Sequence, residues 1–407
     1  QSLLLMILLP LLIACSQSAE ESGAAKSVEQ QESAEALEWV PAWKATSAMG
    51  SIRSGSAVVE QNGVIYMIGG VGGSQFEFVK TTEYARIRPD GSLSEWQAGP
   101  ELNVERGFIG AAIYNNHIYV VGGGRGPNGS ILLDSVERAE IKADGSLGEW
   151  QLEESRLNTK RRCTRVLAVG NHLYAFGGFG GILLDTVEQV EVRPDGSLDE
   201  WLVLSDELTQ ARYIHGVVKA GEILYAVGGH DKVKGLGIPA VEWSREDDEG
   251  LLQPWTQTVP LKEGRYGLAA VLHGDYLYAL GGLSGAAYLD TVEKGRLDPN
   301  GGVMIWEPTT ILPAKREGMN AIVVGDYIYI LGGTNIGGFT NEVYYATFNK
   351  VGDIGYWAPA AEAASVKQAL ARKQEQQKVL PNEAVVVKHI KTAGYSYLGV
   401  KRDDGLS

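Results

Sequence analysis

Cysteine, positive charge and long hydrophobic runs are all scarce in this chain of 407 residues. Two cysteines exclude a disulfide-rich scaffold and zinc sites built from four thiolates. An excess of acidic over basic residues, 50 against 36, argues against a general nucleic-acid binder, which needs a basic face. The apolar run at residues 3–14 is too short for a bilayer, which takes about 20 residues.

The N-terminal run has instead the size of a signal-peptide core. Its end, Leu12-Ile13-Ala14-Cys15, resembles the bacterial lipoprotein box, in which small residues precede a lipidated cysteine. The resemblance implies acyl chains on Cys15 and a place in the bacterial cell envelope, and Ser16 after it favours the outer membrane. The alternative is an ordinary secretory signal with an incidental cysteine. We therefore expect a signal at 1–15 and a flexible acidic tether at 16–36.

Glycine is abundant, at 52 residues, nearly double the usual share of about 7%. Much of it belongs to a repeat of 51 to 55 residues, which is marked by double glycines after apolar-Tyr segments such as HIYVVGG. The double glycines begin at Gly69, Gly122, Gly177, Gly228, Gly281 and Gly332. An arginine precedes each by 16 residues, at Arg53, Arg106, Arg161, Arg212, Arg265 and Arg316. A tryptophan closes each unit, at Trp96, Trp150, Trp201, Trp255, Trp306 and Trp357.

Each unit resolves into four strands. An alternating strand follows the arginine, the Tyr strand ends in the double glycine, and a third strand is joined to the Trp strand by a turn such as PDGSL. Asp-Gly between alternating runs is a strong hairpin signal, because type I′ turns need positive φ. Six copies of a four-stranded antiparallel unit predict an all-β fold, a six-bladed β-propeller.

These markers resemble the Kelch repeat, and the resemblance places a Kelch propeller at residues 37–357. The N-terminal segment around Trp43 and the C-terminal Trp357 both fit the closing strand of the last blade, and the sequence leaves both open. Beyond the propeller we expect a helix-prone linker at 358–380 and an incomplete small β segment at 381–407, so the propeller carries a short helical and β tail.

The six arginines lie on the face where first strands start and second strands end, together with the start of the third strand. A glutamate stands 13 residues before the tryptophan in five units, at Glu83, Glu137, Glu188, Glu242 and Glu293. Because the intervening Gly-Gly has no side chains, we expect an Arg–Glu pair within each blade, a structural ring that avoids unpaired buried charge. Arg316 lacks this partner, and Glu317 or Glu342 are the substitutes.

Residues that break the repeat predict a ligand site on the same face. Blades two to four carry extra cations and aromatics there, which suit a carboxylated sugar or an acidic peptide. The alternative is a solvated charge run without a ligand. The candidate ligand-binding residues are Arg125, Arg161, Arg162, Arg165, Arg212, Tyr213, His215, His230 and Lys232.

Catalytic motifs are weak in this sequence. It has no Walker loop, Rossmann fingerprint or G-x-S-x-G elbow, and no His or Cys spacing typical of a metal site, so we expect no cofactor. A Kelch binding module for protein or acidic glycan is the first hypothesis. The second is a sialic acid mutarotase, since that exported family also has six Kelch blades; the ring glutamates with Arg161, Arg162 or Arg212 would then supply acid, base and carboxylate clamp. The third is a structural envelope scaffold.

Overall fold

The computed structural model describes residues 36–73, 75–231, 236–247, 251–379, 386–392 and 395–400. Within this part the chain is an all-β, six-bladed propeller with a helical and β tail, as the repeat predicts. Cys15 and Lys232 lie outside the described residues, as do 1–35, which hold the expected signal and all of the expected tether except residue 36, and parts of the segment expected at 381–407.

Each blade is an antiparallel sheet in which the strands follow one another outward from the centre of the ring. Alternating apolar residues and tight glycine turns produce these short strands. From the centre outward, blade one consists of β4 (Ala57–Gln61), β5 (Val64–Ile68), β8 (Thr82–Arg86) and β9 (Gln97–Ala98), and blade two of β10 (Gly110–Tyr114), β11 (His117–Val121), β14 (Val136–Glu140) and β15 (Gln151–Leu152). Blade three consists of β16 (Arg165–Val169), β17 (His172–Phe179), β18 (Leu183–Glu191) and β19 (Leu202–Val203), and blade four of β20 (Gly216–Ala220), β21 (Ile223–Val227), β24 (Val241–Arg245) and β25 (Thr256–Gln257). Blade five consists of β26 (Ala269–His273), β27 (Tyr276–Leu280), β30 (Val292–Leu297) and β31 (Val303–Pro308).

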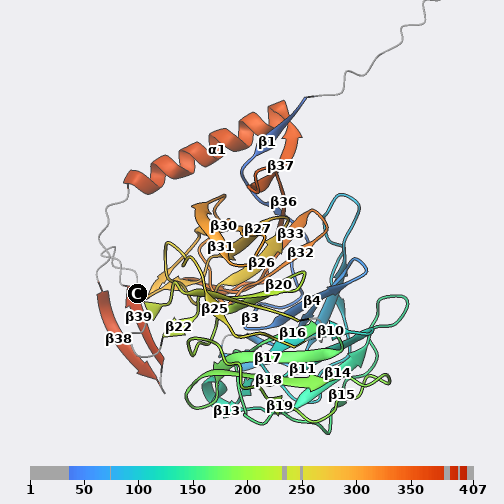
Figure 1. Cartoon of the computed structure of the whole chain (residues 1–407). Helices are drawn as coiled ribbons and strands as arrows, with labels where there is room; N and C mark the ends of the chain where they lie inside the picture. The colour runs from blue at the N-terminus through green and yellow to red at the C-terminus, as the bar shows by residue number, and fades with distance from the viewer. Residues whose placement is uncertain are drawn as a thin grey trace, which may run out of the picture. The chain divides into compact units, whose positions relative to one another are not determined.

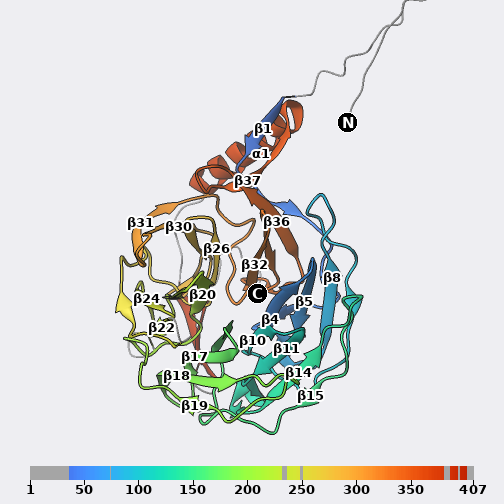
Figure 2. The same cartoon turned by 45° about the vertical axis from the view of Figure 1, so that its right-hand side comes forward.

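The ring closes between blade six and blade one. Blade six contributes β32 (Asn320–Val324), β33 (Tyr327–Leu331) and β36 (Val343–Phe348). The innermost strands contact one another in the cyclic order β4, β10, β16, β20, β26, β32 and again β4. Figure 2 shows the blades arranged around this common centre, blue for blade one and orange-brown for blade six.

The hydrophobic core lies between neighbouring blades. One cluster joins Tyr66 and Ile68 of blade one to Ile118 and Trp150 of blade two. The equivalent cluster across the closure joins Met67 of blade one to residues of blade six. Each blade therefore buries both of its faces against its neighbours.

The repeated tyrosine of the second strand links blades one, two, five and six to the blade that follows each of them. In blade one Tyr66 donates its hydroxyl to the carbonyl of Gly145, in the hairpin turn of blade two, at 2.9 Å. Tyr329 of blade six does the same with Gly91 of blade one at 2.7 Å, and so bridges the closure. The tyrosine of the repeat is thus explained by a hydrogen bond between blades. The glycine of the hairpin turn is explained by its carbonyl, which accepts that hydrogen bond.

The N-terminal segment provides the Trp position of the last blade. Strand β2 (Lys44–Ala45) pairs with β36 in the register that β9 has with β8 in blade one. Trp43 donates its indole N–H to the carbonyl of Ile311 at 3.0 Å, as Trp96, Trp150 and Trp306 do to the equivalent segments. Of the two closing segments that the sequence leaves open, the one around Trp43 occupies this slot.

Trp357 takes a different place. Strand β37 (Ile354–Pro359) pairs with β36 through its first two residues, and then forms a ribbon with β1 (Leu37–Val40). In this ribbon Trp357 meets Trp39 edge to face, with ring centroids 5.3 Å apart, and 52% of Trp357 stays exposed. Residues 37–40 therefore belong to the ribbon and not to the blade.

The tail continues from this ribbon. Helix α1 (Ala360–Val379) packs on β1 and β37 through Ala363 and Val366 (Figure 1). Strands β38 (Val386–Thr392) and β39 (Tyr395–Val400) pair with each other in an antiparallel hairpin.

One end of the propeller, which we call the double-glycine end, carries the loops that follow the six glycine pairs. Short strands and one 3-10 turn form small hairpins there: β3 (Arg53–Ser54), β6 (Val71–Gly72), β7 (Glu77–Phe78), β12 (Gly124–Arg125), η1 (Pro127–Gly129), β13 (Ile131–Leu132), β22 (His230–Asp231), β23 (Leu236–Gly237), β28 (Leu283–Ser284), β29 (Ala287–Tyr288), β34 (Thr334–Asn335) and β35 (Gly338–Phe339). In blade three the corresponding hairpin is continuous with β17 and β18.

Candidate functional site at the double-glycine end

Ion pairs between the repeated arginines and glutamates lie inside the blades. The closest approaches are 2.9 Å for Arg106–Glu137, 2.7 Å for Arg212–Glu242 and 2.7 Å for Arg265–Glu293. Arg53–Glu83 and Arg161–Glu188 are paired in the same way. In blade six Arg316 pairs with Glu342 at 2.9 Å, one of the two substitutes that the sequence offers.

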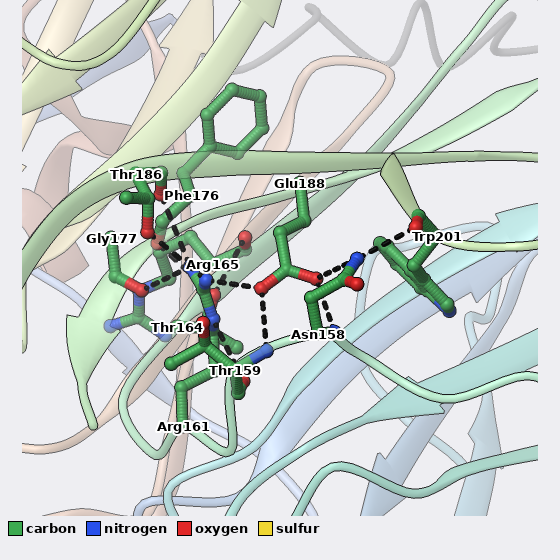
Figure 3. A network of polar contacts seen from close by, with 10 residues as sticks. All are labelled: Asn158, Thr159, Arg161, Thr164, Arg165, Phe176, Gly177, Thr186, Glu188 and Trp201. Atoms are coloured by element: carbon green, nitrogen blue, oxygen red, sulfur yellow. Dashed lines mark hydrogen bonds and ion pairs between the residues drawn. The ribbon is translucent and has the colours of Figure 1, made fainter. Parts of the chain in front are cut away.

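Each arginine reaches its glutamate across the double glycine. Arg161 donates to the carbonyls of Gly177 and Thr186 and pairs with one carboxylate oxygen of Glu188 (Figure 3). The other oxygen accepts the backbone N–H of Asn158, whose side chain continues the network to the carbonyl of Trp201. A Cβ at Gly177 would lie 2.8 Å from the carbonyl of Arg212 in the next blade, so a larger residue does not fit there.

The buried pairs are structural and do not belong to a ligand site. Arg161, Arg212, Glu188 and Glu242 are fully buried. Burial lowers the pKa of the Arg161 guanidinium, and the charge of Glu188 opposes that shift. The expectation that Arg161 and Arg212 contact a ligand is wrong, because their polar groups point into the blade. The ring glutamates are unsuited to acid–base catalysis for the same reason.

Two residues after each arginine, six residues with positive φ surround the centre of the propeller, which we call the channel. Their φ values lie between 54° and 64°, and they are Gly55, Phe108, Cys163, Ile214, Gly267 and Gly318. Backbone hydrogen bonds join neighbours in five of the six steps, all except the step from Cys163 to Ile214, for which none is found among the described residues. Backbone N–H groups donate to the carbonyl of the neighbouring blade, for example Gly318 to Gly267 at 2.8 Å and Cys163 to Phe108 at 2.6 Å. We call this the inner ring. Its residues in blades two, three and four carry side chains in a conformation that favours glycine.

An aromatic arc lies at the mouth of the channel. The rings form two groups, within which contacting ring centroids are 4.5 to 6.2 Å apart. The Arg162 guanidinium lies between the groups, at 6.0 Å from Phe108 and 5.1 Å from Phe179. Most of these rings are half-buried, so they present faces and edges at the surface. The arc consists of Phe339, Phe76, Phe78, Phe108, Phe179, Tyr213, His230 and Tyr266.

Arg162 and Arg165 bring positive charge to this mouth from blade three. Arg162 is 7% exposed and donates to the carbonyls of Asn128 and Gly129. Arg165 is half-buried and donates its Nε to the carbonyl of His215 at 2.6 Å. Its two terminal nitrogens form no hydrogen bond or ion pair with any residue that the structure describes. Burial lowers the pKa of Arg165, and none of the described carboxylates stabilises its charge.

Glu317 brings a negative charge from blade six. Its backbone pairs with Thr334, but its half-buried carboxylate forms no hydrogen bond or ion pair within the described part of the chain. The carboxylate lies against Gly267, where a Cβ would come within 2.6 Å of Oε2. Burial raises the pKa of Glu317 to about 7. This group is therefore poised to exchange a proton near neutral pH.

The remaining candidates have different environments. His215 is fully buried, and burial and then the charges of Arg212 and Arg165 hold its pKa well below the usual range, so it is a neutral residue of the blade interior. The expectation that it contacts a ligand is wrong. His230 is half-buried between Tyr213 and Tyr266, and its Nδ1 has no partner among the described residues. Arg125 is partly exposed and pairs with Glu105 at 3.2 Å.

Cys163 is 8% exposed, and burial raises its thiol pKa to about 11, so a thiolate nucleophile is disfavoured. In the part of the chain that the structure covers, no group of three or more His, Cys, Asp and Glu side chains has the arrangement of a metal site. The helix of the described chain lacks the apolar length that a membrane span requires.

Two surface pockets lie at the opposite end of the blades. The larger, about 610 Å³, is lined by His172, Glu191, Arg193 and Asp199 among others, next to the turn between β16 and β17. The smaller is at the equivalent place in blade two. Their charged walls are open to solvent, and the buried Oε1 of Gln189 in the larger pocket has no partner among the described residues. The double-glycine end is the better candidate because a cation and a carboxylate there, Arg165 and Glu317, form no ion pair within the described chain.

Similarity to known proteins supports the assignment of the repeat. No protein-family model matches the chain. Kelch-like protein 25 of Xenopus tropicalis is 27% identical over 221 residues, 53% of this chain and 35% of its own length. Kelch-like protein 23 of Homo sapiens is 27% identical over 232 residues, 57% of this chain and 37% of its own length. The chain thus spans about a third of the length of these curated relatives.

A solved structure supports the same fold. The structure of YjhT covers 76% of this chain and 98% of its own, with a TM-score of 0.62 and 16% sequence identity. At that identity the likeness concerns the fold alone. The sequence likeness supports a Kelch-type repeat, and the shared architecture shows the propeller fold.

Several residues of the mouth were missed by sequence reasoning. Phe76, Phe78 and Phe339 belong to loops of variable length, where a repeat alignment gives no register. Phe108 was detectable, because it stands two residues after Arg106 where three other repeats have glycine. Glu317 was considered only as a partner for Arg316, although it replaces the tyrosine of the two preceding repeats.

Proposed function

We propose that this Kelch-repeat propeller is a binding module whose site is the channel mouth at the double-glycine end. Its ligand is acidic, a carboxylated glycan or an acidic peptide segment. The single observation that carries the proposal is Arg165, a half-buried guanidinium whose terminal nitrogens have no partner in the described chain. An arginine fork binds a carboxylate through two parallel hydrogen bonds.

The position of Arg165 supports this role. It is the first residue of an innermost strand, and the equivalent residues of the other blades are Ala57, Gly110, Gly216, Ala269 and Asn320. Small side chains are sufficient for the packing of the inner strands, so packing does not explain an arginine. A charge that is desolvated and lacks a counter-ion is costly, and an anionic ligand would relieve that cost.

The aromatic arc supports a ligand with flat or apolar surfaces. Its half-buried rings surround much of the mouth, and such rings stack on sugar faces and peptide groups. The Arg162 guanidinium also packs over both Phe108 and Phe179. Stacking would supply affinity, and the arginines would select for negative charge.

A glycan and peptide array tests the proposal. The full chain should retain carboxylated glycans or acidic peptides over their neutral counterparts, and Arg165→Gln should lower that retention about tenfold. Arg193→Gln is the matched control, because Arg193 pairs with Asp199 at the opposite end of the blade. Retention that is the same in all three proteins, or equal retention of neutral ligands, would reject the site.

A sugar mutarotase is the second candidate, and Glu317 favours it. A carboxyl group with a pKa of about 7 is suited to act as acid and base at neutral pH, and mutarotation needs both. Anomeric exchange of N-acetylneuraminic acid should then be faster with the protein than in buffer and should drop in Glu317→Gln. No acceleration over buffer excludes this activity and leaves the binding function.

A further inference from the structure

The residues that directly follow the six repeated arginines surround the mouth, and two of them carry opposite charges. They are Ser54, Gly107, Arg162, Tyr213, Tyr266 and Glu317. Each is bridged to the segment after its double glycine, so the six occupy equivalent places. Arg162 belongs to blade three and Glu317 to blade six. These blades are three steps apart in a closed ring of six, and therefore face each other across the channel.

The inner ring also differs between the side of Arg162 and the side of Glu317. Around Glu317 it consists of glycines, namely Gly267, Gly318 and Gly55, while around Arg162 it consists of Phe108, Cys163 and Ile214. The backbone strain of three non-glycine residues at positive φ persists only where the surroundings demand it, and such residues cluster at functional sites. The half of the inner ring on the Glu317 side therefore carries no side chains, whereas the half on the arginine side carries those of Phe108, Cys163 and Ile214.

The charges on the two sides are both incompletely satisfied. The Glu317 carboxylate is half-buried and pairs with no described donor, and the Arg165 fork, also from blade three, has no described acceptor for its terminal nitrogens. Ser54, Tyr266 and Thr334 are the polar neighbours of Glu317 in the ring, and none of them is a cation. A purely anionic ligand would satisfy the arginine side and would be repelled at Glu317.

We propose that the ligand is dipolar: its carboxylate binds to Arg165, and a protonated amine on the same molecule binds to Glu317. The inference rests on the function proposed above and narrows its ligand class to amino-bearing acids. A bound ammonium group would also hold Glu317 in its ionised form, because an opposite charge nearby lowers the pKa of a carboxyl group.

Muramic acid and N-acetylmuramic acid form a matched pair of probes. Both carry a sugar ring and a carboxylate, but the amine of the first is charged while that of the second is blocked as a neutral amide. Calorimetric titration of the full chain at pH 7.5 should give at least tenfold tighter binding of muramic acid. Glu317→Gln should remove this preference by weakening muramic acid alone, whereas Arg165→Gln should weaken both sugars.

Glu105→Gln is the control, because Glu105 is a partly exposed carboxylate at the same end whose partner is Arg125. It should leave the preference unchanged. Equal binding of both sugars to the wild type, or a preference for muramic acid that persists in Glu317→Gln, overturns the dipolar ligand. If both sugars still bind more weakly to Arg165→Gln, that result supports an acidic ligand, as proposed above. Failure of both sugars to bind overturns the inference, and the array then decides the proposed function separately.

Discussion

Arg106 and Glu137 form an ion pair of 2.9 Å inside blade two, and both side chains are completely buried. The arginine also donates to the carbonyls of Gly122 and Ser135, and the glutamate accepts the backbone N–H of Asn103. Since both terminal nitrogens of Arg106 and both oxygens of Glu137 bind within the blade, the pair connects strands two and three with the preceding loop. The repeat of arginine and glutamate is therefore a device for blade geometry.

Removing one partner of this pair should be strongly destabilising. Glu137→Ala leaves the Arg106 guanidinium buried without a counter-charge, and we expect a loss of about 3–5 kcal/mol in the free energy of unfolding. Urea unfolding followed by tryptophan fluorescence measures the loss. Glu105→Ala, which breaks the exposed pair with Arg125, should cost about 1 kcal/mol or less. Similar losses in the two variants would show that the buried pairs are not structural.

The hydrogen bond across the closure predicts a second effect on stability. Tyr329→Phe removes the hydroxyl that donates to Gly91 and leaves that buried hydrogen bond unmade, which costs about 1–2 kcal/mol. Tyr84→Phe is the control, since the Tyr84 hydroxyl donates to no residue in the described chain. A shift of the urea midpoint that is equal for the two variants would contradict a closing role for Tyr329.

The two closing tryptophans should differ in their contribution to stability. Trp43→Ala removes the indole that bonds to Ile311 and packs on the core of blades five and six, with an expected loss of about 3 kcal/mol. Trp357→Ala removes a side chain that is 52% exposed in the ribbon, with an expected loss of about 1 kcal/mol. The melting temperatures compare the two, and a larger loss at Trp357 would mean that the C-terminal strand closes the ring.

Glu317 predicts a pH dependence of stability. Its pKa is raised by burial from the usual 4.5 to about 7, so the folded state binds the proton more tightly than the unfolded state. Its contribution is therefore fully present below about pH 4.5 and is lost as the pH rises towards 7, by at most about 3 kcal/mol. Unfolding free energies at pH 5 and pH 8 should differ less in Glu317→Gln than in the wild type. An equal difference would mean that Glu317 has an ordinary pKa.

Lipid attachment at Cys15 stays a prediction from the sequence and has a direct test. In a bacterial host with the lipoprotein pathway, the full chain should incorporate a labelled fatty acid and fractionate with the envelope. Cys15→Ser should lose the label and be released, whereas Cys163→Ser should keep both properties, because Cys163 lies within the propeller. Labelling that survives in Cys15→Ser would rule out this anchor.

The fold could be predicted from the sequence because the same three markers recur at constant spacing. Arg106, Gly122 and Trp150 each have a packing or hydrogen-bonding role that every blade needs, so the pattern is visible six times. The Arg–Glu pairs follow from the same periodicity. The choice between Trp43 and Trp357 could not be predicted, since it depends on how the N-terminal segment registers with β36.

The sequence predicts a ligand site at the double-glycine end, and its position stays a prediction, whereas its list of residues changes once burial is known. Arg161, Arg212 and His215 were assigned to it because they share this end of the blade, but strand periodicity alone does not tell an interior side chain from one that faces the channel. Glu317 and the loop phenylalanines were missed because their roles depend on contacts between blades. The roles of residues that differ between repeats depend on their neighbours in other blades, and these neighbours are known only from the folded ring.

The most direct test of the central claim is the affinity of the full chain for its best carboxylated array ligand, measured by calorimetric titration. The same ligand with its carboxylate reduced to an alcohol is the comparison, and both are titrated into wild type and Arg165→Gln. The account predicts that the wild type prefers the carboxylate at least tenfold and that Arg165→Gln loses this preference. Equal affinities for acid and alcohol in the wild type, or an undiminished preference in Arg165→Gln, would contradict it.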